Sequence, residues 1–251
     1  ANSRIPTFRS LWLDEAKALL AGHERGNPQA RSLLSRLVSR GAMVINLIRQ
    51  RYSPTFEPLP PEPRKPFVLV LLHVQPESTI DAYASHHTDQ IDNIAMIARS
   101  LPATHEIYVK EHPSAAGDRG RDYYRRLKAI PGVRLIPPRS DTFTLLREAW
   151  LVASVAGSAS YEAGLLGVPS VAMTPLFFAD LLITPSLTPK NEDPISLKAK
   201  VDAYLAIPET ERRERAVRLI QNVLRCSLPA LVSDPYSNPA CLDPENLEKL
   251  A

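Results

Sequence analysis

The 251-residue sequence carries a formal net charge of +3, with 44% hydrophobic and 23% charged residues. This composition is typical of a globular protein with a full-sized core, and so small and dispersed a positive charge argues against nucleic acid as a partner. The two cysteines, Cys226 and Cys241, form neither a disulfide framework nor a CxxC metal motif, which favours a reducing, cytoplasmic setting. No apolar run reaches the roughly 18 residues that a membrane span needs.

Residues 1–53 are expected to be helical. Apolar residues recur near the helical period, most clearly between residues 33 and 48, and Asn27-Pro28 is a good helix start. We expect these helices to cover a neighbouring domain or a partner, and the long apolar stripe would also suit a homo-oligomer. Six prolines then fall within residues 54–66, and this density predicts a stiff, extended linker.

From residue 67 the pattern alternates between short apolar runs and helical periodicity. The expected strands are 67–72, 106–110, 133–136, 151–155 and 169–173. Helices are expected between them, one of which Thr88 would cap, with the others at 121–129, 142–149 and 159–166. This alternation predicts an α/β fold over residues 67–192, a Rossmann-like parallel sheet with helices on both faces. Two further helices, at about 194–206 and 209–226, and a tail fill residues 193–251.

Right-handed crossovers place every strand-to-helix loop on one edge of such a sheet, and ligands bind there. The strand 106–110 ends in the polar cluster Lys110-Glu111-His112-Pro113. His112 could donate to a phosphate oxygen and Lys110 adds positive charge, while Pro113 turns the chain. Glu111 alternates away from its neighbours and is expected to serve structure only. A histidine that bonds a loop carbonyl is the plain alternative for His112.

The strand 151–155 runs into a turn of small residues and then a helix. The first turn of that helix exposes backbone N–H groups and the positive end of the helix dipole, beside the hydroxyls of Ser158 and Ser160. Gly157 would let the backbone approach a ligand closely. Glu162 could complete a capping box or accept hydrogen bonds from a ribose. The alternative is an ordinary N-cap serine on a buried helix.

The loop after the first strand supplies a carboxylate. Glu77 is one of few acidic residues expected on this edge, and it is the available general base for an acceptor hydroxyl, although a solvated loop glutamate is the default interpretation. His86-His87 has no companions at metal-ligand spacing, so we predict no metal site.

Three blocks of sequence together resemble the bacterial capsule polysaccharide biosynthesis family. They are 72–77 (LHVQPE), 108–113 (YVKEHP) and 157–163 (GSASYEA), the last followed by Gly167-Val168-Pro169. That family includes the retaining Kdo transferases of capsule assembly and is related in design to bacterial sialyltransferases. The resemblance covers residues 67–180.

The resemblance implies a metal-independent GT-B glycosyltransferase that needs no cofactor and acts in the cytoplasm, with peripheral attachment to the inner membrane left open. Its Rossmann-like half would bind a nucleotide sugar, typically a CMP-activated ulosonic acid, and a glycan or glycolipid would be the acceptor. His112 and the pair Ser158 and Ser160 would contact the donor phosphate, and Glu77 would be the catalytic residue. Where Kdo transferases tend to hold consecutive acids, this loop has Gln75-Pro76-Glu77.

A complete GT-B enzyme has two Rossmann-like domains, and residues 1–66 contain no run of strands that could build one. We therefore expect a fragment lacking most of the acceptor domain, or an acceptor side reduced to helices. Two alternatives stay open at this point. One is a nucleotide-sugar epimerase of the same architecture, and the other is a non-catalytic binding or scaffold module.

Overall fold

The computed structural model describes residues 55–62, 65–112, 117–184, 194–227 and 239–249, together with Ala115, Ala230 and a few positions between 38 and 48. Most of the predicted helical segment 1–53 lies outside the described residues, and so does Pro113.

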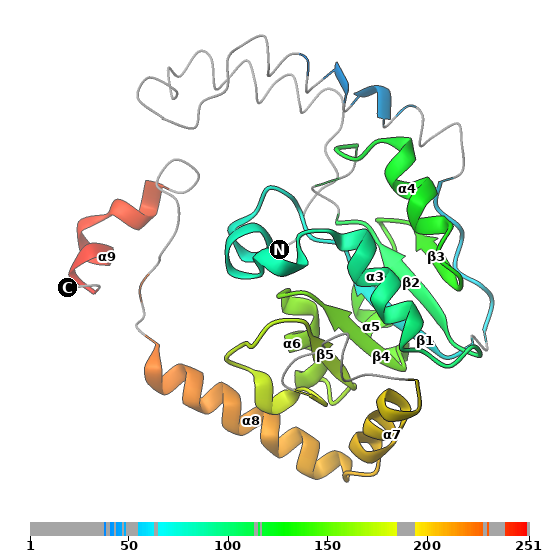
Figure 1. Ribbon diagram of the computed structural model, residues 1–251. Coiled ribbons are helices and arrows are strands. Elements are labelled where there is room, and N and C mark those ends of the chain that lie inside the picture. The colour runs from blue at the N-terminus through cyan, green and yellow to red at the C-terminus, as the bar shows by residue number, and fades with distance from the viewer. Residues whose placement is uncertain are drawn as a thin grey trace.

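The centre of the protein is a five-stranded parallel sheet in the order β3-β2-β1-β4-β5 (Figure 1). The strands are β1 (Phe67–Leu71), β2 (Glu106–Lys110), β3 (Val133–Ile136), β4 (Leu151–Ser154) and β5 (Ser170–Ala172). Leu69 of β1 pairs with Tyr108 on one side and with Val152 on the other. The first of the described strands is therefore the middle strand of the sheet, and the direction of winding reverses beside it. The predicted α/β class with a Rossmann-like parallel sheet is confirmed.

Helices cover both faces of the sheet. The face that includes Val68 and Ile107 packs against α3 (Gln90–Arg99) and α4 (Arg121–Lys128), and the opposite face packs against α5 (Thr142–Glu148) and α6 (Ser158–Leu165). Each crossover helix lies within one or two residues of its predicted range. The alternation of inward-facing residues along the buried strands fixes which side chains reach each core.

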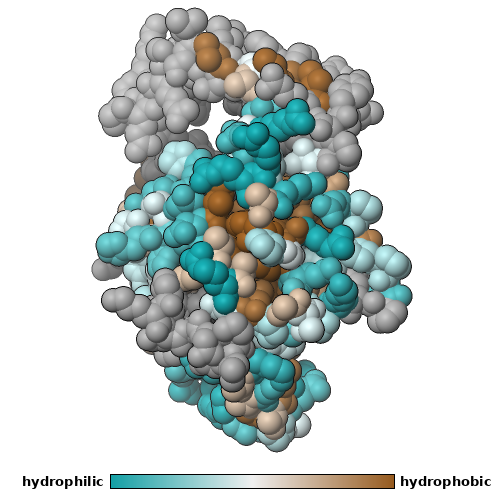
Figure 2. Space-filling view, turned by 45° about the vertical axis from the view of Figure 1, so that its right-hand side comes forward, coloured by the Kyte–Doolittle hydropathy of each residue, from teal (hydrophilic) through white to brown (hydrophobic). Residues whose placement is uncertain are grey.

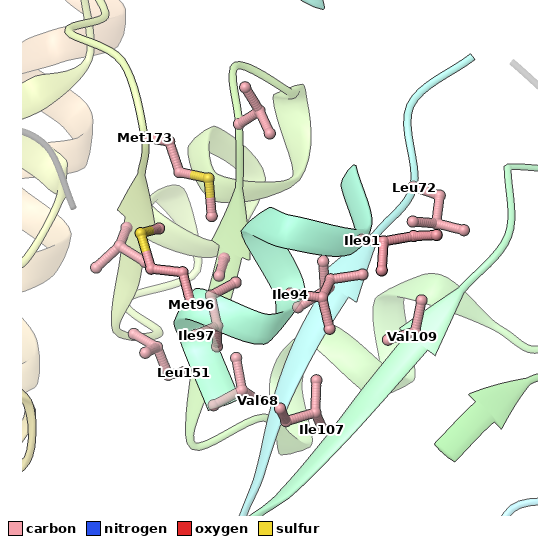
Figure 3. Packing of buried hydrophobic residues seen from close by; sticks show 14 of the residues in the cluster. Val68, Leu72, Ile91, Ile94, Met96, Ile97, Ile107, Val109, Leu151 and Met173 are labelled. Carbon is pink, nitrogen blue, oxygen red and sulfur yellow. The ribbon is translucent and has the colours of Figure 1, made fainter. Parts of the chain in front are cut away.

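The larger core lies between α3 and the sheet. Ile91, Ile94 and Ile97 recur at helical spacing on α3 and pack over β1, β2 and β4 (Figure 3). Each such side chain contributes about 1.5–3 kcal/mol when it is fully buried. The prediction that Thr88 caps this helix is wrong. Asp89 is the N-cap, and its carboxylate accepts from the N–H groups of Ile91 and Asp92. A carboxylate at that position also complements the helix dipole.

The segment between β1 and α3, which we predicted to be a polar loop, contains two short helical turns. They are a π-helical turn at Thr79–Tyr83 and a 3-10 turn at Ser85–His87. Ile80 is fully buried in the α3-side core. The Tyr83 hydroxyl donates to the carbonyl of Pro175 over 2.5 Å. The loop is therefore packed onto the domain at both points.

The described part of the proline-rich stretch, residues 55–62 and 65–66, forms neither helix nor strand. It nevertheless lies against the edge of the sheet. The N–H of Glu57 donates to Leu135 O over 2.7 Å, and its carboxylate pairs with Lys128 and Arg134. The Phe56 ring meets Tyr124 edge-on at 5.4 Å. Its role as a domain boundary stays a prediction.

The two predicted C-terminal helices are confirmed as α7 (Pro194–Leu205) and α8 (Glu209–Cys226), and a short helix α9 (Pro244–Glu248) follows. Leu197 and Val201 of α7 are fully buried in the α3-side core. The boundary that we placed after residue 192 stays a prediction. α8 instead packs over α6 and the 3-10 turn Ala179–Leu181, with Ala216 buried in that contact.

The surface combines charged regions with apolar ones. Figure 2 shows one face on which hydrophobic residues gather centrally and are bordered by hydrophilic ones. On α8, Val217, Ile220 and Leu224 are among the exposed large hydrophobic residues. None of the described helices combines the length and the apolar character that crossing a membrane requires.

Candidate functional site

The candidate site lies where the winding of the sheet reverses, at the carboxyl ends of β1 and β4. His73 follows β1, and Gly157 follows β4. A Cβ atom placed on Gly157 would lie 3.1 Å from His73 Cε1 and 3.4 Å from its Nε2, so the imidazole touches the glycine backbone. A side chain at residue 157 would occupy this space. Open α/β sheets bind ligands at the carboxyl ends of the strands, at the point where the winding reverses. We call this place, between His73 and the start of α6, the crevice.

His73 is an unusual residue for a strand end. Its side chain is only 9% exposed, and its buried Nε2 has no hydrogen-bond partner among the described residues. It also lines a small cavity between α3 and the ends of β1 and β4, beside Gln90, Asn93 and Ser154. Burial lowers the pKa of His73 from its ordinary value of 6.5; the Glu77 carboxylate opposes this, while His112 and Arg119 lower the pKa further. The free imidazole is therefore neutral near pH 7.

The start of α6 faces this imidazole. Gly157 is its N-cap, with extended backbone angles (φ −84°, ψ 158°), and no side chain caps the first turn. The first N–H groups of a helix have no partner inside the helix, and the helix dipole makes that end positive. The α6 start therefore presents unpaired donors and positive potential beside His73. An anion such as phosphate satisfies both.

The two predicted serines of α6 have different surroundings in the structure. Ser158 is exposed, and its hydroxyl donates to Glu162 over 2.9 Å, one turn along the helix. Ser160 is fully buried and donates to the carbonyl of Val171 over 2.6 Å. It also shares a 2.8 Å hydrogen bond with Ser154. Ser158 and Glu162 are thus paired on the outer side of the first turns of α6, and Ser160 is held inside the domain.

Glu111 is the centre of a buried network at the end of β2. Its carboxylate is fully buried and accepts from three donors: the Arg119 guanidinium, the Tyr124 hydroxyl at 2.7 Å and the N–H of His112 at 2.7 Å. Burial raises the pKa of Tyr124, and Glu111 acts in the same direction, so the hydroxyl stays protonated and donates. The expectation that Glu111 faces away from its neighbours agrees with this placement.

Two side chains fix the backbone of His73. Arg119 donates to His73 O while it pairs with Glu111, and so it ties the end of β1 to the end of β2. The buried amide of Gln90, the first residue of α3, accepts from His73 N over 2.7 Å and donates to His73 O over 3.1 Å. A buried charged pair with several hydrogen bonds holds one geometry. The imidazole is therefore presented by a rigid frame.

The predicted residues Lys110, His112 and Pro113 differ in how the structure places them. Lys110 is only 3% exposed. Burial lowers its pKa, which Asp141 at the start of α5 and Glu111 partly restore. His112 is partly exposed and close enough to His73 to affect its pKa. Pro113 lies outside the described residues.

Glu77 lies at the open side of the site. Its side chain is 44% exposed, and its Oε2 lies 3.9 Å from His73 Nδ1. The other oxygen accepts from the Thr79 hydroxyl at 3.3 Å. The two nitrogens of His73 therefore face opposite ways, one toward Glu77 and the other toward the α6 start. Glu77 is free to reach a ligand from the solvent side.

Sequence reasoning did not single out His73, Gln90 or Arg119. The signal for His73 would have been its place after the first strand, because that strand becomes the central one in this type of sheet. Within the described ranges, no three His, Cys, Asp or Glu side chains are grouped so that they could hold a metal ion.

Comparisons with known proteins find likenesses only among solved structures. No family model matches the sequence, and no curated protein matches it. The Thermosulfurimonas dismutans KpsC β-Kdo 2,7-transferase is 16% identical, with a TM-score of 0.39 over 85% of this chain and 67% of that one. The β-Kdo 2,4-transferase of the same KpsC is 21% identical, with a TM-score of 0.36 over 59% of this chain and 47% of that one.

A third likeness is to the UDP-GlcNAc 2-epimerase of Neisseria meningitidis, bound to UDP-GlcNAc. It is 14% identical, with a TM-score of 0.39 over 87% of this chain and 52% of that one. The chain thus spans from about half to two thirds of the length of these three proteins.

Proposed function

We propose that the described domain is the nucleotide-sugar-binding half of a glycosyltransferase of bacterial surface or capsular polysaccharide assembly. The donor is a CMP-activated or related nucleotide sugar, and the acceptor is a glycan or glycolipid. One observation carries the proposal: the uncapped start of α6 lies against a buried imidazole whose Nε2 has no partner among the described residues, and the ring packs where a side chain at residue 157 would be. That arrangement suits the phosphate of a donor.

The chemistry of sugar transfer requires that negative charge on the departing nucleotide phosphate be stabilised. In a metal-independent enzyme, preorganised backbone N–H groups and cationic or donor side chains supply that stabilisation. The first turn of α6 supplies the N–H groups, and Ser158 lies at its exposed start. His112 approaches from the end of β2, where Glu111 holds its N–H. Lys110, two positions before His112, adds positive potential.

Glu77 is the proposed catalytic carboxylate. Its side chain is 44% exposed and lies 3.9 Å from His73 Nδ1. Its backbone carbonyl accepts from the N–H groups of Ile80 and Asp81, so Glu77 is held at the start of the following turn. In this position it can take the proton of an acceptor hydroxyl or act at the anomeric carbon. Glu162 is proposed to accept from a ribose hydroxyl, because it is paired with Ser158 on the outer side of the first turns of α6.

The binding half of the proposal is tested by calorimetric titration of CMP and UDP against the wild-type protein and His112→Ala. We expect one nucleotide to bind in the presence of EDTA and the variant to bind at least tenfold more weakly. Comparable binding by the variant would remove His112 from the site. The catalytic half is tested with a panel of nucleotide sugars and acceptors, in which Glu77→Gln should bind nucleotide but not turn over. Nucleotide binding without turnover across the panel would favour a non-catalytic module.

A further inference from the structure

His73 Nε2 has no hydrogen-bond partner among the described residues, although its side chain is more than nine-tenths buried. A buried polar atom without a partner is costly, since it has given up its hydrogen bonds to water. Buried polar groups are almost always satisfied, so an exception of this kind calls for an explanation. In this protein the atom lies 3.4 Å from the position that a Cβ of Gly157 would take, at the first turn of α6.

The position of the His73 ring is fixed by hydrogen bonds to the backbone of the residue. Its backbone is held on both sides by the Gln90 amide, and its carbonyl also accepts from Arg119. Because residue 157 has no side chain, the imidazole packs directly against the start of α6. The unpaired nitrogen and the uncapped N–H groups therefore converge on one place.

We propose that His73 is a proton-linked receptor for the anionic group that binds at the start of α6. Its Nε2 hydrogen-bonds a phosphate oxygen, and the ring takes up a proton from solvent when the anion binds. This inference deepens the proposed function, on which it rests for the identity of the ligand as a nucleotide phosphate. It adds a recognition residue and a pH dependence that the function alone does not require.

The charges around His73 determine whether anion binding raises or lowers its pKa. In the free protein, burial keeps the pKa of His73 below 6.5. The charged groups that act on the ring are Glu77 from its own loop, His112 from the end of β2 and Arg119 from the following loop, whereas the α3 residues that line the cavity, Gln90 and Asn93, are uncharged. A phosphate at Nε2 adds negative charge in contact with the ring, which favours the imidazolium and raises the pKa.

Binding and protonation are then coupled. Between the pKa of the free ring and that of the occupied ring, affinity for the anion increases as the pH falls, by at most tenfold for each pH unit. Below and above that window the affinity attributable to His73 becomes constant. Glu77 partly compensates the new positive charge from the Nδ1 side, where it lies 3.9 Å away.

The direct test is an NMR titration of the imidazole signals of the wild-type chain, with and without inorganic pyrophosphate and with and without CMP. The sequence has 6 histidines, so substitution of each by glutamine assigns the spectrum. We expect saturating pyrophosphate to raise the pKa of His73 by at least one unit. His105 is the internal control, because it is also partly buried but precedes β2, at the opposite edge of the sheet. A His73 signal that titrates identically with and without bound anion overturns the inference.

A second measurement uses His73→Gln. Its fold should persist, because Gln90 and Arg119 bind the backbone of residue 73. We expect the ratio of wild-type to variant affinity for pyrophosphate to increase as pH falls from about 8 to about 6. The ionisation of pyrophosphate itself cancels in this ratio. A ratio that does not change with pH contradicts the proton linkage.

The outcomes separate the two proposals. If pyrophosphate binds and shifts His73 while no nucleotide binds, the nucleotide function fails and the His73 inference stands. If nucleotide binds without a shift of His73, the inference fails and the function stands. If neither pyrophosphate nor nucleotide binds, both are overturned.

Discussion

His73 and Gly157 face each other across the point where the strand order reverses, and the imidazole fills the space in front of the glycine so closely that a Cβ there would lie 3.1 Å from Cε1. Two loops more than eighty positions apart in the sequence thus form one surface. The consequence is that the smallest possible side-chain addition at residue 157 should close the proposed anion site.

Gly157→Ala is the variant that tests this. The backbone of residue 157 has ordinary extended angles, so alanine is allowed there and the fold should persist. We expect the added methyl group to crowd His73 and to reduce pyrophosphate and nucleotide affinity by at least tenfold. The matched control is Gly120→Ala, since Gly120 is the N-cap of α4 with similar angles and has open space where its Cβ would be. Equal affinities of the two variants would contradict the site.

Substitution of the two serines of α6 should have different effects, one on stability and the other on binding. Ser160→Ala removes the donor to Val171 O and the partner of Ser154 inside the domain, so we expect a loss of about 1–3 kcal/mol in the free energy of unfolding. Its affinity for nucleotide should stay within twofold of wild type. Ser158→Ala should leave stability within about 0.5 kcal/mol, because Ser158 is exposed, and should weaken binding. Urea unfolding and calorimetry check both variants, and the reverse pattern would restore Ser160 as a ligand contact.

Glu111→Gln should be among the most destabilising single changes in the domain. It leaves the Arg119 guanidinium buried without a counter-charge, and breaking such a pair costs about 3–5 kcal/mol. Asp122→Asn is the control, because Asp122 and Arg125 form a pair at the surface of α4 whose loss should cost no more than about 1 kcal/mol. Equal losses in a urea unfolding experiment would mean that the Glu111 network does not stabilise the crevice.

Close packing between α6 and the turn at Ala179–Leu181 makes a further prediction about stability. A Cβ on Gly164 would lie 2.8 Å from Leu181 Cβ, so Gly164→Ala forces the two elements apart. Overpacking of this kind costs about 1–3 kcal/mol, which exceeds the roughly 1 kcal/mol by which alanine favours the helix. We expect a lower melting temperature in a thermal scan, and an unchanged or higher one would show that this contact is loose.

The pH dependence of stability should report His73 in the ligand-free protein. The folded-state pKa lies below the unfolded value of 6.5, so in the window between the two the unfolded chain binds more protons. The free energy of unfolding therefore rises with pH through that window and gains nothing more above it. In His73→Gln this contribution is absent, so the stability difference between wild type and variant should shift in favour of wild type as pH rises to about 7. A difference that is independent of pH would contradict the assignment.

Much of the fold follows from local sequence patterns. The strand at Glu106–Lys110 agrees with its predicted bounds. Strands of a parallel sheet are buried on both faces, so a short apolar run bounded by polar residues marks where such a strand begins and ends. The helix predicted at 159–166 is α6, and Gly167 follows it with a φ of +72°, a conformation that disfavours other residues. The cap of α3 was misplaced by one residue, since Thr88 and Asp89 are both good caps and only the backbone decides.

The site was harder to predict than the fold, because it depends on strand order and long-range contacts. Lys110, His112, Ser158 and Glu77 were chosen as polar residues at strand ends. Nothing in the local pattern says that β1 lies between β2 and β4, and this order is what places His73 at the centre. Folding also brings together two pairs of residues that the local pattern does not connect. Glu111 pairs with Arg119, and the side chain of Gln90 accepts a hydrogen bond from the N–H of His73.

The most direct test of the account is calorimetric titration of CMP and UDP against the wild-type protein, Gly157→Ala and Gly120→Ala, at one pH near 6.5. The account predicts that the wild type and Gly120→Ala bind one nucleotide with equal affinity and that Gly157→Ala binds it at least tenfold more weakly. Absence of nucleotide binding to the wild type, or equal binding by all three, would contradict the claim that the crevice between His73 and α6 holds the donor phosphate.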